Sequence, residues 1–396
     1  MQQLQGWRKF DDWGSQSAIA EFLGETPGPR PVSELWFGNH PDGPTLLQDG
    51  STLGDLIAQD PKKALGSGIL YAFGSNLPFL MKVIAPDETL SLQVHPTKEI
   101  AREGFLREEV LGIERTAPNH SYRDMNHKPE MLYALTDFEA LIGFRVPRKA
   151  RRLLEGLEGE LAELLRRRLK LSTVRGGLRS LASWVFDIDS PVTPALVEEF
   201  VGACRARLES GNSPSLRADQ LVCELEAVHG GDSGIILAFL MNPVSLRAGE
   251  AAYIPPRQIH AYQRGLGIEV MAASDNVIRA GLTHKHVDSA QLVEIAEFSA
   301  LPPVRLAPEH PSPHSDRFLA PAQEFELTVT TCTPDLSNLR VPGEGPRIAM
   351  VTRGRLSLST EAGECTLGRG EAVFISASER QLRITGEGEL VQCSAP

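Results

Sequence analysis

Cysteine is scarce in this chain of 396 residues, which holds five of them at scattered positions. No two cysteines form a CxxC pair, and their number is odd. This usage excludes a disulfide framework and a cysteine-type zinc site, and it is typical of reduced thiols in a cytoplasmic protein. The cysteines are Cys204, Cys223, Cys332, Cys365 and Cys393.

Long hydrophobic runs are also missing. The most apolar stretch, Ile235 to Met241, is much shorter than the roughly 20 residues that a membrane helix needs. Residues 1–13 are polar and charged and contain no apolar signal-peptide core. No GxGxxG or GxxxxGK[ST] sequence occurs, so there is no nucleotide-binding signature to place. These absences favour a cytoplasmic protein that does not enter a membrane.

Positive charge is in deficit, because 40 Lys and Arg face 51 Asp and Glu and leave a net charge of −11. We therefore expect neither nucleic acid nor an anionic membrane as a partner. A small anionic substrate stays compatible, since it experiences the local charge of a pocket. With 41% hydrophobic and 23% charged residues the composition is that of a soluble globular protein, long enough for two or three domains.

The first 146 residues carry short runs in which apolar side chains alternate with others, as in a strand with one buried face. The apolar positions of two such runs are Phe79, Met81 and Val83, and Leu90, Leu92 and Val94. In the second run Ser91, Gln93 and His95 take the opposite face. Many short strands separated by turn residues favour an antiparallel sandwich or barrel.

The pattern changes near Pro147, where leucines recur at helical spacing. Helices are predicted over 148–170, 193–208 and 218–228, with Gly- and Ser-rich separators at 175–180 and 210–215. We interpret 147–230 as a helical insertion. Its run of three arginines, Arg166 to Arg168, is expected to be a solvated helix face.

Strand patterns resume after the insertion. The run Ile235 to Met241 is predicted to be a buried strand, and a Pro-rich stretch at 301–314 is predicted to be a linker. Further strands are predicted at 348–351, 356–358, 365–367 and 372–375, set off by glycines such as Gly354. The pattern Leu-x-x-Gly-Glu-Ala-x-x-Ile occurs twice, at 246–254 and 367–375, which indicates two copies of one small barrel. The first copy is followed six residues later by a histidine, His260, whereas the second copy is not.

Four residues make a plausible set of metal ligands: Gln93, His95, Glu130 and His260. Two imidazoles, one carboxylate and one amide oxygen suit a borderline cation, with zinc favoured over Mn²⁺, Co²⁺ and Fe²⁺. One carboxylate leaves a divalent ion with a net positive charge, so the metal keeps its Lewis acidity. The alternative is that His95 and His260 are ordinary hydrogen-bonded histidines, and composition and spacing alone do not bring the four residues together.

A resemblance to a known family brings these four residues together, and it is carried by five sequence blocks that occur in order along residues 13–288. They are Trp13-Gly14, then Glu34-Leu35-Trp36 with Gly38-x-His40-Pro41, then Leu92-Gln93-Val94-His95-Pro96, Asn126-His127-Lys128-Pro129-Glu130 and Ser274-Asp275-Asn276-Val277-Ile278-Arg279-Ala280-Gly281-Leu282-Thr283. The chain thereby resembles the type I mannose-6-phosphate isomerases of the cupin superfamily. One departure is His284, where the family more often has proline.

The resemblance implies a mainly β fold with a helical insertion. Residues 1–146 together with 231–300 would form the catalytic cupin-type barrel, a jelly roll. Residues 147–230 would form the helical domain, and 301–396 a second jelly-roll barrel without metal. These boundaries agree with those of the hydrophobic patterns.

The resemblance also implies a reaction, the interconversion of mannose 6-phosphate and fructose 6-phosphate through a cis-enediol, in the service of mannose activation or mannose use. One Zn²⁺ per chain would lie on Gln93, His95, Glu130 and His260. Arg279 matches the catalytic arginine, which would stabilise the enediolate. Lys128, Glu269 and Asp275 are candidates for proton transfer or for orienting roles, and Ser91, Lys285 and Lys82 for binding the substrate and its phosphate. The expected partner is the sugar phosphate alone, bound by a monomer.

Two other classes remain as alternatives. A cupin oxygenase would use Fe²⁺ and O₂, and its usual shell of histidines is poorly matched by Gln93. A non-catalytic sugar-phosphate-binding cupin would keep affinity without turnover, and it gives no reason for Arg279 in its Asp-Asn-Val-Ile-Arg-Ala-Gly context. Two conspicuous residues, Trp36 and His40, are expected to pack or form hydrogen bonds and not to bind metal.

Overall fold

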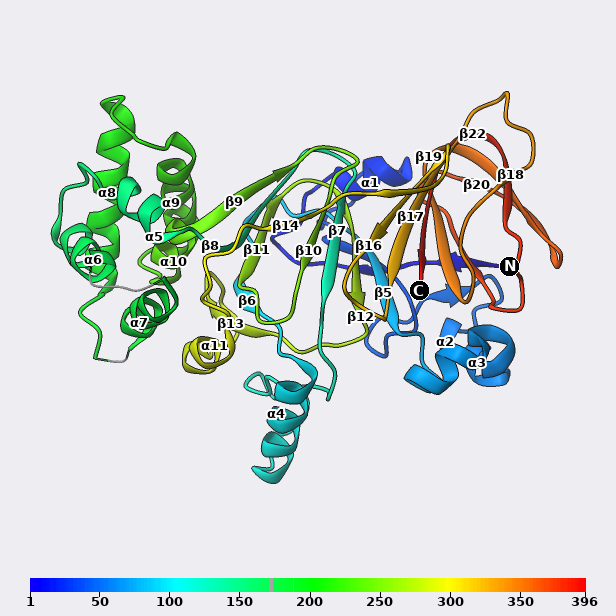
Figure 1. The fold of residues 1–396 in the computed structure, drawn as a ribbon, viewed down its shortest axis with the longest axis horizontal. Helices are drawn as coiled ribbons and strands as arrows, with labels where there is room; N and C mark the ends of the chain where they lie inside the picture. The colour runs from blue at the N-terminus through cyan, green and yellow to red at the C-terminus, as the bar shows by residue number, and fades with distance from the viewer. Residues whose placement is uncertain (171–173, 188) are drawn as a thin grey trace.

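Three β-sheets and a group of helices follow one another along the long axis of the molecule (Figure 1). The computed structural model describes residues 1–170, 174–187 and 189–396. Within these ranges the chain is mostly β-sheet with several helices. No helix in the described ranges has both the length and the apolar character required to cross a bilayer.

A five-stranded antiparallel sheet lies beside the helices. Its order is β13 (Ile278–Gly281), β6 (Leu92–Val94), β11 (His260–Arg264), β8 (Phe138–Phe144) and β9 (Met241–Leu246). Alternation along β6 confirms the predicted two-faced strand: Leu92 and Val94 are fully buried against the helices, whereas Gln93 between them takes the other face.

A seven-stranded antiparallel sheet lies on the other side of β6. Its order is β14 (Val304–Leu306), β10 (Ala251–Ile254), β7 (Glu130–Ala134), β12 (Gly267–Ala272), β5 (Phe79–Ile84), β3 (Glu34–Phe37) and β2 (Trp7–Lys9). The predicted alternation of β5 is confirmed, because Phe79, Met81 and Val83 all join one apolar core. Its remaining positions, Lys82 among them, face the five-stranded sheet.

A ten-stranded antiparallel sheet forms the other end of the molecule. It contains β15 (Glu309–Ser312), β16 (Ser315–Leu319), β17 (Glu326–Cys332), β22 (Arg383–Ser394), β19 (Arg347–Thr360), β21 (Ala372–Ile375), β1 (Gln2–Gln5), β4 (Leu46–Leu47), β18 (Leu339–Arg340) and β20 (Gly363–Gly368). The first strand of the chain, β1, pairs with β21 close to the last, and both termini lie at this end (Figure 1).

The helices cluster mainly at the opposite end, where α5 to α10 gather (Figure 1). Their bounds are α5 (Pro147–Leu153), α6 (Glu160–Lys170), α7 (Val174–Phe186), α8 (Pro194–Glu209), α9 (Leu216–His229) and α10 (Gly234–Leu240). The others are α1 (Ala18–Leu23), α2 (Leu53–Gln59), α3 (Pro61–Phe73), α4 (Lys98–Val110) and α11 (Ser289–Ile295). An ion pair between Arg207 and Asp219, both buried, links α8 to α9.

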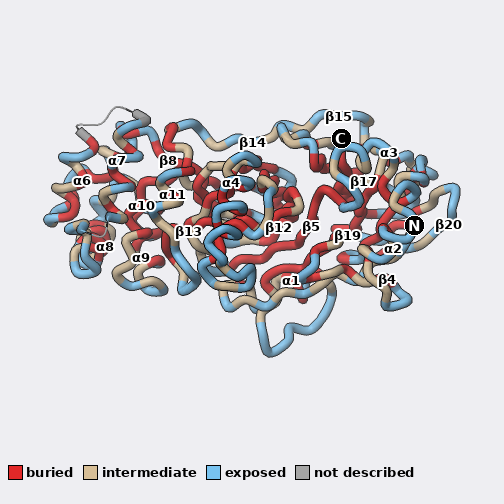
Figure 2. Tube along the Cα trace, turned by 90° about the horizontal axis from the view of Figure 1, so that it is seen from below, coloured by how far each residue is buried: buried red, intermediate tan, exposed pale blue. Residues whose placement is uncertain are grey.

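Four large apolar cores fill the spaces between these layers, and Figure 2 shows the buried segments as a central band through the molecule. One core lies between the helices and the five-stranded sheet, and one between the seven- and ten-stranded sheets. A third lies inside the ten-stranded sheet. The fourth lies between the seven- and five-stranded sheets, and here a group of charged side chains shares the interior with apolar ones.

Several predicted elements are wrong. Ile235 to Met241 is helical up to Leu240, because periodicity cannot distinguish a short buried helix from a buried strand. The helices therefore continue beyond position 230, as far as Leu240. The predicted separator at 175–180 lies inside α7. The predicted helix over 148–170 is two helices, α5 and α6, separated around the positive-φ residues Gly156 and Gly159.

The carboxyl-terminal part also departs from prediction. Residues predicted as a linker form two strands: β14 belongs to the seven-stranded sheet and β15 to the ten-stranded sheet. Gly354 does not end a strand but lies inside β19, next to a register shift at Val351 and Arg353. Its φ is +75°, and a Cβ there would overlap the carbonyl oxygen of Glu387, so only glycine lets the strand bend and continue.

Candidate metal centre

Strand register places three predicted site residues side by side on the five-stranded sheet. Gln93 on β6 is opposite His260 on β11 and opposite Arg279 on β13. Directly opposed residues project to the same face, so these side chains point together into the space between the two sheets. His95, two residues after Gln93, projects to that face as well.

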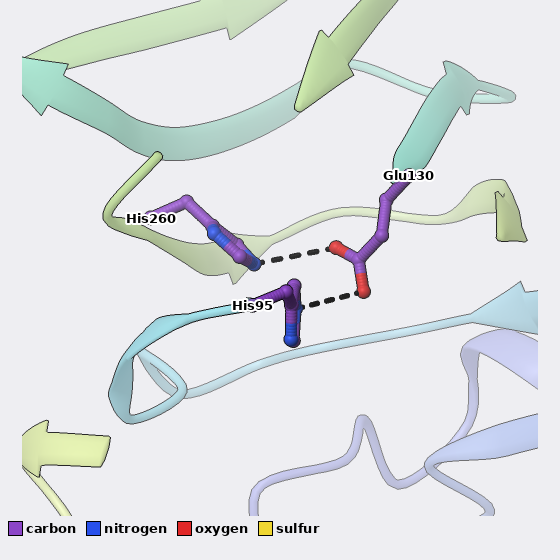
Figure 3. Close-up of side chains that lie close together, drawn as sticks. All are labelled: His95, Glu130 and His260. Carbon is purple, nitrogen blue, oxygen red and sulfur yellow. Dashed lines mark ion pairs between the residues drawn. The ribbon is translucent and has the colours of Figure 1, made fainter. Parts of the chain in front are cut away.

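Glu130 reaches the same space from the seven-stranded sheet, where it begins β7. Its carboxylate lies between the two histidines: Oε1 is 3.0 Å from His95 Nε2, and Oε2 is 3.3 Å from His260 Nε2 (Figure 3). All three residues are buried, at 2% exposure or less. The structure thus brings together two imidazoles and one carboxylate from three strands or strand ends.

The hydrogen bonds of the two histidines indicate which kind of ligand this cluster can bind. His95 Nδ1 donates to the carbonyl oxygen of Asn276 at 2.7 Å, and His260 Nδ1 donates to that of Gln258 at 3.0 Å. Burial lowers the pKa of His95 to about 4, partly opposed by Glu130, so the ring is neutral near pH 7 and its Nε2 carries a lone pair. Neither Nε2 has a hydrogen-bond partner within the described chain.

Two buried imidazole nitrogens without a hydrogen-bond partner in the described chain face one carboxylate, an arrangement that a cation held between them would satisfy. Histidines that bind metal through one nitrogen commonly donate the other N–H to a backbone carbonyl, as both do here. The donor set, two imidazole nitrogens and a carboxylate within 4.8 Å of one another, fits a borderline divalent cation such as Zn²⁺. Gln93, opposite His260, offers an amide oxygen from the same face.

A second acidic and histidine cluster does not fit a metal. Asp42 N–H donates to His40 Nδ1 at 3.2 Å, so the remaining nitrogen, Nε2, carries the hydrogen and donates to Asp275 Oδ2 at 2.9 Å. Neither ring nitrogen of His40 has a free lone pair. As predicted, His40 forms hydrogen bonds; it orients Asp275, and although burial opposes the charge of Asp275, this bond lowers its pKa.

Buried charges continue along the seven-stranded sheet. Lys82 Nζ donates to Glu269 Oε2 at 3.0 Å across the β5–β12 pair. Burial opposes the charge of Lys82, but Glu269 and Glu34 raise its pKa above the usual value. Burial raises the pKa of Glu269, against the attraction of Lys82. A carboxylate with a raised pKa, paired with a cation and located beside a metal site, is typical of catalytic acid–base groups.

A cavity of about 880 Å³ collects the predicted residues. All of them line it except His95 and His260, which are buried beside Glu130. The lining members are Ser91, Gln93, Lys82, Lys128, Glu130, Glu269, Asp275, Arg279 and Lys285. Lys128 Nζ lies 3.3 Å from Glu130 Oε1. The group of His95, Glu130 and His260, called the metal cluster below, therefore forms one wall of the cavity.

Sequence reasoning missed two contributors. The Tyr262 hydroxyl donates to Glu130 Oε2 at 3.4 Å. Its signal was available, because Tyr262 follows His260 by two residues on one strand and must share its face. Asn276 was missed as a support: its carbonyl holds His95, and its side-chain amide donates to the Asp124 and Asn126 carbonyls at 2.8 Å each. Only the folded chain reveals that role.

Comparison with known proteins identifies the family of the chain. Residues 1–147 match the family model described as phosphomannose isomerase type I, catalytic domain. The chain is 33% identical to mannose-6-phosphate isomerase 1 of Arabidopsis thaliana, over 91% of this chain and 84% of that one. It is 32% identical to mannose-6-phosphate isomerase of Escherichia coli strain K12, over 96% of each chain.

Solved structures agree over the whole length. Mannose 6-phosphate isomerase from Salmonella typhimurium, bound to its substrate and a zinc atom, superimposes with a TM-score of 0.89 at 29% identity, covering 100% of this chain and 99% of that one. A mannose 6-phosphate isomerase bound with zinc and yttrium gives a TM-score of 0.90 with the same coverage and identity. The chain belongs to the type I phosphomannose isomerase family.

Proposed function

We propose that this chain is a zinc-dependent aldose–ketose isomerase that interconverts mannose 6-phosphate and fructose 6-phosphate through a cis-enediol. The observation that carries the proposal is the convergence of the buried His95 and His260 Nε2 atoms on Glu130, at the wall of a cavity rich in acid–base groups. Membership of the family supplies the reaction.

Zn²⁺ would be held by Gln93, His95, Glu130 and His260. When bound, it supplies a Lewis acid for substrate oxygens next to the carbon atoms that exchange a proton. The role of the protein around it is to fix the ligands. The Asn276 and Gln258 carbonyls fix the two imidazoles, and Tyr262 and Lys128 hold Glu130 by its oxygens.

The reaction needs a group that takes a proton from C2 of the aldose and returns one to C1, with no net gain or loss. Glu269 is the group that the surroundings favour, since its pKa is raised and Lys82 fixes one oxygen. Lys128 and Asp275 line the same cavity and remain in the proposal as proton-relay or sugar-binding groups. The hydrogen bond to Glu269 gives Lys82 a positioning role in addition to the substrate binding predicted for it.

Arg279 is proposed to stabilise the enediolate. Its guanidinium lines the cavity on the same face as Gln93, and a guanidinium keeps its charge throughout the reaction. Ser91, which lines the cavity two residues before Gln93, and Lys285 are proposed to bind the phosphate. The substrate would then extend from the metal ligands toward Lys285, whose side chain is 56% exposed.

For the fold, we propose a cupin-type jelly roll formed by 1–146 and 231–300, a helical domain at 147–230 and a second jelly roll at 301–396. Across these boundaries α10 packs with the helical domain, β14 pairs with β10, and β1 pairs with β21. The repeated turns support the proposed fold: Leu246–Ile254 and Leu367–Ile375 each end in a strand, β10 and β21, within antiparallel sheets. The apolar core inside the ten-stranded sheet supports a second barrel without metal. We also propose a cytoplasmic monomer with no nucleic-acid or membrane partner.

A coupled assay of mannose 6-phosphate conversion to fructose 6-phosphate tests the proposal. Arg279→Ala should lower kcat/KM by about 100-fold or more while the zinc content stays at the wild-type level. Chelator-treated protein should lose turnover and recover it with zinc. If zinc-loaded wild type shows no turnover, the isomerase assignment for this substrate fails, and oxygen uptake with Fe²⁺ then tests the oxygenase alternative.

A further inference from the structure

The cationic side chains that line the cavity fall into two groups. The lysines are paired with carboxylates: Lys9 with Glu34 at 3.3 Å, Lys82 with Glu269 at 3.0 Å, Lys128 with Glu130 at 3.3 Å and Lys285 with Asp11 at 3.5 Å. The arginines, Arg123 and Arg279, form no ion pair with any residue that the structure describes. Within the described chain, the lining cations without an ion-pair partner are therefore two guanidinium groups.

These two arginines are electrostatic neighbours. Burial, and after it the charge of Arg123, lowers the pKa of Arg279, and Asp11 opposes this. The only hydrogen bond that Arg123 makes within the described chain is from Nη1 to the Arg115 carbonyl, at a long 3.4 Å. Two like charges facing one cavity repel each other, and a bound dianion would remove that repulsion.

The backbone on both sides of Arg123 is fixed. The preceding residue, Tyr122, donates its N–H to Glu108 Oε2 at 2.9 Å. The following residue, Asp124, donates its N–H to Asn276 Oδ1 at 3.2 Å and accepts from Asn276 Nδ2 at 2.8 Å. The carbonyl of Asn276 also holds His95. The Arg123 backbone is thus held at a set position relative to the metal cluster, while its exposed side chain reaches the outer part of the cavity.

We propose that Arg123 is a further substrate-binding residue, which holds the phosphate group of the substrate at the mouth of the cavity that Arg279 also lines. The inference rests on the proposed function and deepens it, since it places the phosphate on a guanidinium as well as on Ser91 and Lys285. A guanidinium binds two phosphate oxygens at once, whereas an ammonium acts as a point charge. Lys285, already 3.5 Å from Asp11, has part of its charge compensated.

The kinetic test compares Arg123→Gln with Arg115→Gln. Arg115 lies on the same segment, loses the same charge on substitution, does not line the cavity, and presents only its backbone carbonyl to Arg123. Arg123→Gln should raise KM for mannose 6-phosphate about 10-fold or more with kcat nearly unchanged, because binding to the remote phosphate is the same in the ground and transition states. Arg115→Gln should match wild type, and Arg123→Lys should lie between.

A second measurement separates this inference from the proposed function. Calorimetric titration with inorganic phosphate should give an affinity that falls about 10-fold in Arg123→Gln but not in Arg115→Gln, with zinc content and unfolding temperature unchanged. If Arg123→Gln and Arg115→Gln have the same KM and phosphate affinity, the role of Arg123 is wrong. If phosphate binding depends on Arg123 but wild type does not turn over mannose 6-phosphate, the anion site stands and the proposed function fails.

Discussion

Two β regions of this chain carry the same nine-residue turn pattern but have opposite interiors. Between the seven- and five-stranded sheets, the first region encloses charged side chains, among them Lys82, Glu130 and Glu269. The core inside the ten-stranded sheet is made of apolar residues, such as Val351, Leu358 and Ile384. The two interiors thus have different roles: the apolar interior contributes stability, and the charged interior supports chemistry at a cost in desolvation.

The charged interior is tolerable because its members compensate one another. Each lysine that lines the cavity has a carboxylate within 3.5 Å, and both buried imidazoles donate their Nδ1 hydrogens to backbone carbonyls. What is left over, the His95 and His260 lone pairs and the two arginines, is what a metal ion and a phosphorylated sugar would use. In this charged interior, the groups without a protein partner in the described chain are those that suit a bound ligand.

The largest effect is expected from breaking the metal cluster. His260→Ala removes one of the two nitrogen donors, so zinc affinity should fall and kcat/KM should drop by about 10³-fold or more, since the Lewis acid contributes several kcal/mol. Metal analysis and the coupled assay check both values. The matched control is His310→Ala in the other β region, where the exposed imidazole pairs with Asp316 and should affect neither.

The next effect should appear in stability without any change in activity. Leu358→Ala leaves a cavity in the apolar core of the ten-stranded sheet, where Leu358 is fully buried, and should cost about 2–5 kcal/mol in the free energy of unfolding. Denaturant titration measures this, with the half-exposed Leu319→Ala as control. A large loss of kcat/KM in folded Leu358→Ala would contradict the separation of roles between the two regions.

A smaller effect concerns acid stability. Although burial opposes its charge, Lys82 and Lys9 lower the pKa of Glu34 to about 2, against an ordinary value of 4.5 in the unfolded chain. Because the folded pKa is depressed, Glu34 stabilises the protein above about pH 4.5, and this contribution, up to about 3 kcal/mol, is lost as the pH falls toward 2.

Glu34→Gln should therefore be less stable than wild type at neutral pH and should show a flatter loss of stability between pH 4.5 and 2. Unfolding temperatures across this range check it, with Glu103→Gln as an exposed control on α4. Parallel curves for wild type and Glu34→Gln would mean that the buried charges of the first region are not compensated as described.

Much of this arrangement could be predicted from sequence. Alternation along 90–95 correctly placed Gln93 and His95 opposite Leu92 and Val94, and the family resemblance added Glu130 and His260 to the set. The family assignment itself follows from five short blocks, and the relatives confirm it. These features are local or motif-bound, so one sequence is enough to show them.

The rest depends on contacts between distant segments. The buried helix α10 reads like a strand because both are short and wholly apolar. Pairing of β1 with β21, which joins the two ends of the chain, leaves no local pattern. The exposed Arg123 looks like any surface arginine until the structure shows that it lines the same cavity as Arg279 and has no carboxylate partner in the described chain.

Titration of Zn²⁺ into chelator-treated protein, with mannose 6-phosphate turnover followed throughout, shows whether the charged interior is a single zinc-dependent active site. Activity should rise from near zero and reach its plateau at one zinc per chain, with no such rise in His260→Ala. Activity that survives without metal, or that rises equally in His260→Ala, would mean that the charged interior is not that site.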